Sequence, residues 1–167
     1  MNRAQVRRKR VWARRQGLVA GIGATGTVVN LGEDFSADMG TTHLPPGVTV
    51  GGVLLDLACA RATAATDSAS SQLQLGILVD SAATPADVPR PVDMPHADWM
   101  WDQMISFPAP TAGALTSTFD RIGGPIRVRS KRRIEEINQD LWLVLQGIDP
   151  TPTFDVRIFV STLLLLP

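Results

Sequence analysis

Runs in which apolar and polar residues alternate constrain the fold of this chain more than any other feature. In residues 48–66, six apolar side chains share one face if the Gly51-Gly52 pair forms a β-bulge that shifts the alternation by one residue. A period of two over a run of this length predicts a β-strand with one face in the core. The six residues are Val48, Val50, Val53, Leu55, Leu57 and Cys59.

The alternation recurs along the chain between segments rich in proline and glycine. It predicts strands at residues 72–80, 126–133 and 153–166, and further strands are predicted at 27–31, which is rich in β-branched residues, and at 141–148. The segment "ADWMWDQMISF" is predicted as either a short helix or a strand, and "FSADMG" as one helical turn ending at Gly40. We expect seven or eight strands and no helix longer than two turns, which is the pattern of an all-β sandwich or barrel.

The segments between these strands carry two further predictions. The polar stretch "DSASS" is a turn, so the strands at 48–66 and 72–80 are predicted to form an antiparallel hairpin. Residues 81–98 contain four prolines and are predicted to form a long surface loop. This loop and the segments "THLPPGV" and "SFPAPTAGAL" are rich in apolar residues, and exposed apolar patches of this kind usually mark protein contacts.

Residues 21–26 read GIGATG and match the glycine pattern that cradles a dinucleotide pyrophosphate. That site needs a helix after the glycines, whereas "TVVNLGEDF" follows them and begins with three β-branched residues. We therefore interpret Gly21, Gly23 and Gly26 as a turn or strand edge that leads into a strand, and we predict no cofactor. A nucleotide-dependent enzyme would remain in consideration only if residues 27–40 were helical.

Charge is distributed unevenly along a chain whose 16 basic and 16 acidic residues balance. Residues 1–15 contain seven basic residues and no acid, and the first acid is Glu33. We predict a basic N-terminal arm at residues 1–15 and one folded domain at residues 16–167. The seven basic residues are Arg3, Arg7, Arg8, Lys9, Arg10, Arg14 and Arg15.

An arginine-rich arm is suited to neutralising phosphates in a salt-sensitive way that does not depend on sequence. Trp12, within the arm, could stack on a base. The alternative interpretations of the arm are a solvated tail and a targeting signal. A second cluster, Arg127–Arg133, is either another patch on an inner surface or a partner for the acidic body of a neighbouring subunit.

Other chemistry is sparse. Cys59 is the single cysteine and is interpreted as a small buried apolar residue. His96, Asp98 and Asp102 match no metal or acid–base motif, so we interpret their segment as a loop anchored by its tryptophans. No nucleophile elbow, phosphate loop or membrane-spanning run is found. We predict no metal site, no catalysis and no membrane partner.

An all-β body behind an arginine-rich arm resembles the single jelly-roll coat proteins of small icosahedral viruses. The closing segment "VRSKRRIEEINQDLWLVLQGIDPTPTFDVRIFVSTLLLLP" is similar to the end of coat proteins from small viruses and phages. There, a basic strand leads through a short acidic turn to an apolar strand and a last strand ending in Leu-Pro. The "WARR" start, the "DF" loop at residues 34–40 and "ADWMWD" also fit this resemblance.

The resemblance implies an antiparallel two-sheet sandwich, a single jelly roll of about eight strands. It implies a capsid subunit that assembles with many copies of itself around a viral genome of DNA or RNA. The arm would then contact the packaged nucleic acid, and the subunit would reside in the virion after assembly in a reducing host-cell interior. Two alternatives stay open, namely an accessory phage virion protein (head decoration or tail component) and a cellular β-sandwich module that binds nucleic acid.

Overall fold

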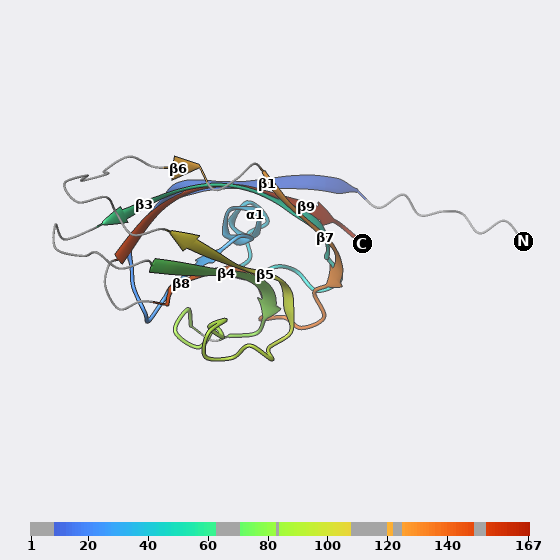
Figure 1. The fold of residues 1–167 in the computed structure, drawn as a ribbon. Helices are drawn as coiled ribbons and strands as arrows, with labels where there is room; N and C mark the ends of the chain where they lie inside the picture. Colours follow the sequence, from blue (N-terminus) through green and yellow to red (C-terminus); the bar gives the residue numbers. More distant parts are fainter. Residues whose placement is uncertain (1–8, 63–70, 83, 108–119, 122–124, 149–152) are drawn as a thin grey trace, which may run out of the picture.

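The computed structural model describes residues 9–62, 71–82, 84–107, 120–121, 125–148 and 153–167. Strands and one short helix make up most of this part of the chain (Figure 1). The elements are β1 Arg10–Ile22, β2 Thr27–Asn30, α1 Glu33–Asp38, β3 Thr49–Ala62, β4 Ser71–Asp80, β5 Trp99–Phe107, β6 Asp120–Arg121, β7 Ile126–Arg133, β8 Asp140–Gly147 and β9 Thr153–Leu165.

The strands form two antiparallel sheets that pack face to face. One sheet has the order β1-β9-β3-β6, with β7 also paired to β3, and the other has the order β2-β8-β4-β5. Figure 1 shows the first sheet arching over the second. The inner faces of both sheets, together with Phe35 of α1, form one apolar core.

The pairing of the strands identifies the topology. β1 pairs with β9, β2 with β8, β3 with β7 and β4 with β5, so the chain folds back on itself as nested antiparallel pairs. Additional pairing of β9 with β3 and of β8 with β4 rolls this long ribbon into two sheets. This arrangement is the jelly roll, which confirms the predicted all-β sandwich.

The predicted hairpin between the strands at 48–66 and 72–80 is wrong. β3 lies in the sheet with β9 and β7, whereas β4 lies in the other sheet between β8 and β5. From β1 to β4, consecutive strands alternate between the two sheets, so the chain crosses from one layer to the other between β3 and β4. A polar turn shows that the chain changes direction but not which sheet it enters.

The bulge predicted in β3 is confirmed. The register of β3 against both β9 and β7 shifts between Val50 and Gly52. The six apolar residues predicted for one face are 0–3% exposed. A Cβ atom on Gly52 would lie 2.9 Å from the carbonyl oxygen of Val128, so the close approach of β7 requires a glycine there.

Gly23 and Gly26 bound the turn between β1 and β2, and Gly21 lies near the end of β1, in keeping with the predicted turn or strand edge. The amide of Gly26 donates to the carbonyl of Gly23 at 3.0 Å, and Gly26 has a φ of 69°. Residues 27–30 are the strand β2 rather than a helix, and α1 is confined to Glu33–Asp38. The condition that a nucleotide-dependent enzyme required is therefore not met.

The outer faces of the two sheets differ. Residues 81–98 form the predicted loop, and its Val88, together with Trp99 at the start of β5, packs on Trp142 and Val144 of β8. Because β8 has apolar neighbours on both sides, every one of its residues is buried. The loop therefore covers the outer face of the β2-β8-β4-β5 sheet, and these apolar residues pack within the subunit.

Candidate nucleic-acid interface

The outer face of the β1-β9-β3-β7 sheet, called the basic face below, carries most of the exposed cations of the described residues. Strand register places side chains in rows across it, because directly paired residues of antiparallel strands point to the same side. One row joins Arg14, Ser161, Leu54 and Arg127. The next rows are Trp12, Leu163, Gly52 and Arg129, and then Arg10, Leu165, Thr49 and Arg133.

These rows share a common layout. The two outer strands, β1 and β7, contribute exposed basic side chains, whereas the two inner strands contribute mainly apolar ones. Arg157 of β9 is exposed on the same face beyond these rows. The exposed cations of the face are Arg10, Arg14, Arg127, Arg129, Lys131, Arg133 and Arg157. Two carboxylates, Asp56 of β3 and Asp155 of β9, belong to further rows of the same face. The cations outnumber these carboxylates, so the face is electropositive.

Large apolar side chains also lie exposed on this face, on β1 and on the neighbouring strand β9. Trp12 is 55% exposed, Phe159 is 54% exposed and Leu18 is 58% exposed, although each belongs to a well-formed strand. Phe159 lies opposite Gln16, four residues along β1 from Trp12. At about 3.3 Å per residue, the two aromatic side chains are separated by roughly 13 Å along the strands.

A shallow depression lies on this face. It has a volume of about 700 Å³ and is lined in part by Arg14, Gln16, Leu54, Asp56 and Phe159. The depression joins the arginine line of β1 to the apolar side chains of β9 and β3. A flexible polyanion with an apolar component could therefore lie here with its charges against β1.

The predicted binding residues of the arm differ in where they lie. Arg3, Arg7 and Arg8 lie outside the described residues. Lys9 is exposed directly before β1, and its carbonyl accepts from the amide of Leu166.

Residues 10–15, which the charge pattern assigned to the arm, form the first half of β1 and pair with β9. They are therefore part of the sandwich. Arg10 and Arg14 lie exposed on the basic face because they alternate with Val11 and Ala13, which face the core.

Arg15 differs from the other predicted residues because its charge is neutralised within the subunit. Its guanidinium contacts Glu33 Oε2 at 2.8 Å and Asp34 Oδ1 at 3.0 Å, at the start of α1. Two carboxylates at this distance hold the arginine at the β1 edge. We therefore leave Arg15 out of the set that is available to a polyanion.

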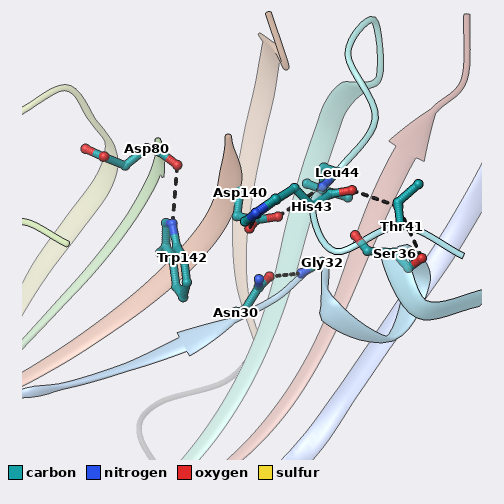
Figure 2. Close-up of polar contacts among 9 residues, drawn as sticks. All are labelled: Asn30, Gly32, Ser36, Thr41, His43, Leu44, Asp80, Asp140 and Trp142. Atoms are coloured by element: carbon teal, nitrogen blue, oxygen red, sulfur yellow. Dashed lines mark hydrogen bonds and ion pairs between the residues drawn. The ribbon is translucent and has the colours of Figure 1, made fainter. Parts of the chain in front are cut away.

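A histidine–aspartate pair that sequence analysis did not identify lies near β2, the edge strand of the other sheet. Asp140, the first residue of β8, is buried and accepts from His43 Nδ1 at 2.6 Å and from the amide of Leu44 at 3.0 Å (Figure 2). The nearby Thr41 hydroxyl donates to the carbonyls of Ser36 and His43. These contacts fasten the segment before β3 to β8, so the pair is structural.

This pair forms part of the wall of a second depression. It has a volume of about 640 Å³ and lies between the β1 and β2 edges of the two sheets. Its polar lining combines Arg15, Glu33, His43 and Asp140. The partners of each pair are far apart in the sequence, so no local motif could have indicated them.

The segment containing His96, Asp98 and Asp102 is anchored by a tryptophan, as predicted. Trp99 Nε1 donates to the carbonyl of Met94 at 3.0 Å. Asp98 forms an ion pair with Arg132, and Asp102 accepts from Gln74. Among the residues that the structure describes, no group of three His, Cys, Asp or Glu side chains could hold a metal ion.

Arg90 is also engaged within the subunit. Its guanidinium donates to the carbonyls of Thr25 and Val88, which joins the 81–98 loop to the β1–β2 turn. Partial burial lowers the pKa of Arg90, while the nearby Asp93 opposes this effect. Within the described part of the chain, no helix is long and apolar enough to cross a membrane.

Comparisons with known proteins find similarity in structure but not in sequence. The sequence matches no protein-family profile, and no curated protein is similar to it in sequence. The chain is similar to one from the cyanophage Pam1 capsid, with 17% identity and a TM-score of 0.41, over 100% of this chain and 98% of the other. It is also similar to a chain of turnip yellow mosaic virus, with 15% identity and a TM-score of 0.40, over 96% and 94% of the two chains.

Proposed function

We propose that this chain is a capsid subunit that assembles with many copies of itself around a viral genome. In this proposal the subunit has a structural rather than a catalytic role, and the basic segment before β1 faces the packaged nucleic acid. The observation that carries the proposal is that this segment leads directly into the basic face of a jelly-roll sandwich. Lys9 and Arg10 join the two, so the arm and the face would form one electropositive surface.

Exposed apolar side chains elsewhere support assembly. Met94 and Val92 of the 81–98 loop, Met104 of β5 and Ile137 after β7 are all exposed. β5 is also an edge strand of nine residues, and its outer backbone groups have no strand neighbour among the described residues. A shell covers such edges and patches with neighbouring subunits, whereas a soluble monomer leaves them available for aggregation.

The arm is proposed to bind the genome through Arg3, Arg7, Arg8, Lys9, Arg10 and Arg14. Arginines that neutralise phosphates give affinity that falls steeply with salt and does not depend on base sequence. Such binding suits a subunit that must package a whole genome. Phosphate contacts of this kind suit a DNA genome and an RNA genome equally.

The test compares the full chain with two variants. One variant lacks residues 1–9, so that β1 stays intact, and the other replaces Arg3, Arg7, Arg8 and Lys9 with glutamine at constant length. Negative-stain microscopy and light scattering measure assembly, and ultraviolet absorbance of the particles measures their nucleic acid. We expect the full chain to form closed, uniform shells that contain nucleic acid and both variants to lose most of it.

Other results would exclude the proposal. A stable monomer or small ring that binds no nucleic acid would rule out a capsid subunit and favour an accessory virion protein. A monomer that binds nucleic acid without assembling would favour a cellular binding module. Shells that keep their nucleic acid in both variants would show that the arm does not hold the genome.

A further inference from the structure

We propose that the basic face binds single-stranded nucleic acid, with Trp12 and Phe159 stacking on bases and the flanking arginines contacting phosphates. This inference deepens the proposed function and rests on it, since a packaged genome is the polyanion that the face would meet. It assigns a role to the Arg127–Arg133 cluster, which the proposed function leaves without one.

The layout of charges favours a polyanion that lies along the strands. Arg10 and Arg14 form one line on β1, and Arg127, Arg129 and Arg133 form another on β7. β9 and β3 separate the two lines, which at about 4.8 Å per strand places them roughly 14 Å apart. A strand of nucleic acid lying between the lines would have a cation within reach of its phosphates on either side.

The exposed aromatic side chains of β1 and β9 favour unpaired bases. An aromatic ring on a strand that keeps more than half of its surface in contact with water is only partly packed within the subunit, so a large part of it is available to a partner. Trp12 and Phe159 both meet this description. Proteins that bind single strands usually combine a positively charged groove with aromatic side chains, because every base has a face that can stack on an aromatic ring.

A duplex fits the face less well. Proteins read duplex grooves by inserting a helix or a two-stranded ribbon, and the basic face offers neither because it is the flat side of a wider sheet. In a duplex the bases are also stacked on one another. The rings of Trp12 and Phe159 would then have no base face to contact.

A second copy of the chain is the main competing partner for the exposed apolar side chains of the basic face. In a two-fold pairing, the same surface of both copies would meet. The arginine lines of the two copies would then lie against each other across the contact, and like charges brought together at an interface oppose association. Charge complementarity therefore favours nucleic acid over a symmetric dimer.

The experiment measures oligonucleotide binding by the full chain, dispersed at low concentration, with Trp12→Ala and Phe159→Ala variants. Met104→Ala is the matched control, because Met104 is 51% exposed on β5 of the other sheet. The probes are poly-dT and poly-rU of about 16 nucleotides, the upper size of a site on an OB fold, and a DNA duplex of equal length. Fluorescence anisotropy of a label on the probe gives the affinity.

We expect each aromatic substitution to weaken single-strand binding by about 5- to 150-fold, the effect of losing one stacked base. The dependence of affinity on salt should stay unchanged in these variants. In contrast, Arg14→Gln or Arg129→Gln should reduce the slope of log affinity against log salt concentration by about 0.7, the effect of one lost phosphate contact. Met104→Ala should bind like the wild type, and the duplex should bind more weakly than either single strand.

A second readout identifies the stacked residue directly. Oligonucleotide should quench the tryptophan fluorescence of the wild type, and Trp12→Phe should lose most of that quenching while it keeps a ring that can stack. Unchanged affinity in both alanine variants, or equal binding of duplex and single strand without quenching, would overturn the inference. Loss of assembly with intact oligonucleotide binding would instead identify the face as a contact between subunits.

The two proposals can fail separately. If the full chain forms no shells but the single strand quenches Trp12, the capsid function is wrong and the binding face stands. If shells form and retain nucleic acid in the Trp12→Ala and Phe159→Ala variants with unchanged affinity, the capsid function stands and the binding face is wrong.

Discussion

The three glycines at the end of β1 and in the β1–β2 turn should respond differently to alanine, because only two of them have a left-handed backbone. Gly21 and Gly26 have φ values of 67° and 69°, whereas the φ of Gly23 is not positive. A Cβ atom on Gly21 would meet nothing within 4 Å, and one on Gly23 would make an ordinary contact of 3.9 Å with Thr153. On Gly26, the same atom would lie 2.9 Å from the carbonyl oxygen of Leu145.

These geometries give three different free energies of unfolding. Replacing glycine with alanine in a compatible conformation stabilises a protein by about 0.4–1 kcal/mol, because the unfolded chain loses freedom. A left-handed backbone costs alanine roughly 1–2 kcal/mol, and forcing an atom into a filled site costs about 1–3 kcal/mol more. Gly23→Ala should therefore stabilise by about 0.5 kcal/mol, Gly21→Ala should destabilise by about 1 kcal/mol and Gly26→Ala by about 2–4 kcal/mol.

Urea unfolding of the dispersed subunit, followed by circular dichroism, measures the three values. The slope of the free energy against urea should be the same in all variants, since each changes the native state locally. A loss for Gly23→Ala as large as that for Gly26→Ala would refute the reasoning. Equal losses at all three positions would mean that something approaches all three glycines, as a nucleotide does in a phosphate-binding turn.

Two further predictions concern contacts between distant segments. Asp140→Ala should destabilise the fold by about 1–3 kcal/mol, because it leaves the buried amide of Leu44 without its acceptor. His43→Ala should cost less in the same urea series, and an equal cost would contradict this account. Gly76→Ala should cost about 1–3 kcal/mol, since its Cβ atom would lie 2.5 Å from the ring of Trp99. The 81–98 loop should then become easier to cleave in limited proteolysis, and wild-type resistance would contradict its anchoring by Trp99.

The strand faces could be predicted from the sequence because burial on one side of a strand imposes a period of two. In β9, Phe154, Val156, Ile158 and Val160 are all buried, as their alternation indicated. The same principle predicted the β3 bulge, since only a shift at the glycine pair keeps the apolar residues on one face. Periodicity of this kind reports which side of a strand is buried.

Periodicity does not report which strands are neighbours. The error on β3 and β4 arose because sheet membership depends on pairing with β9 and β8, which are distant in the sequence. The pair of His43 and Asp140 was missed for the same reason, as the residues are 97 positions apart. The high charge of residues 10–15 also concealed the strand alternation of Val11 and Ala13.

The residues that alternate with the buried ones point outward, so the same pattern also predicts which side chains of a strand can belong to the basic face. Trp12 and Phe159 occupy the outward positions of β1 and β9, and this could be inferred once the inward positions were assigned. Their meeting on one face could not be inferred, because it requires the register that pairs Gln16 with Phe159. Sequence therefore predicted the ingredients of the candidate interface, and the topology placed them together.

The central place of β9 in its sheet has a consequence for the order of events during synthesis. β9 is the last strand in chain order, yet it separates β1 from β3 and pairs with both along most of its length. During synthesis, β1 and β3 therefore cannot complete their pairing until β9 has been made. Pairing between strands so far apart in the sequence is also slow. The rows that carry the cations and the aromatic rings do not exist until then, so a nascent chain cannot present the basic face to nucleic acid. The topology thus delays the appearance of this surface until β9 has been synthesised.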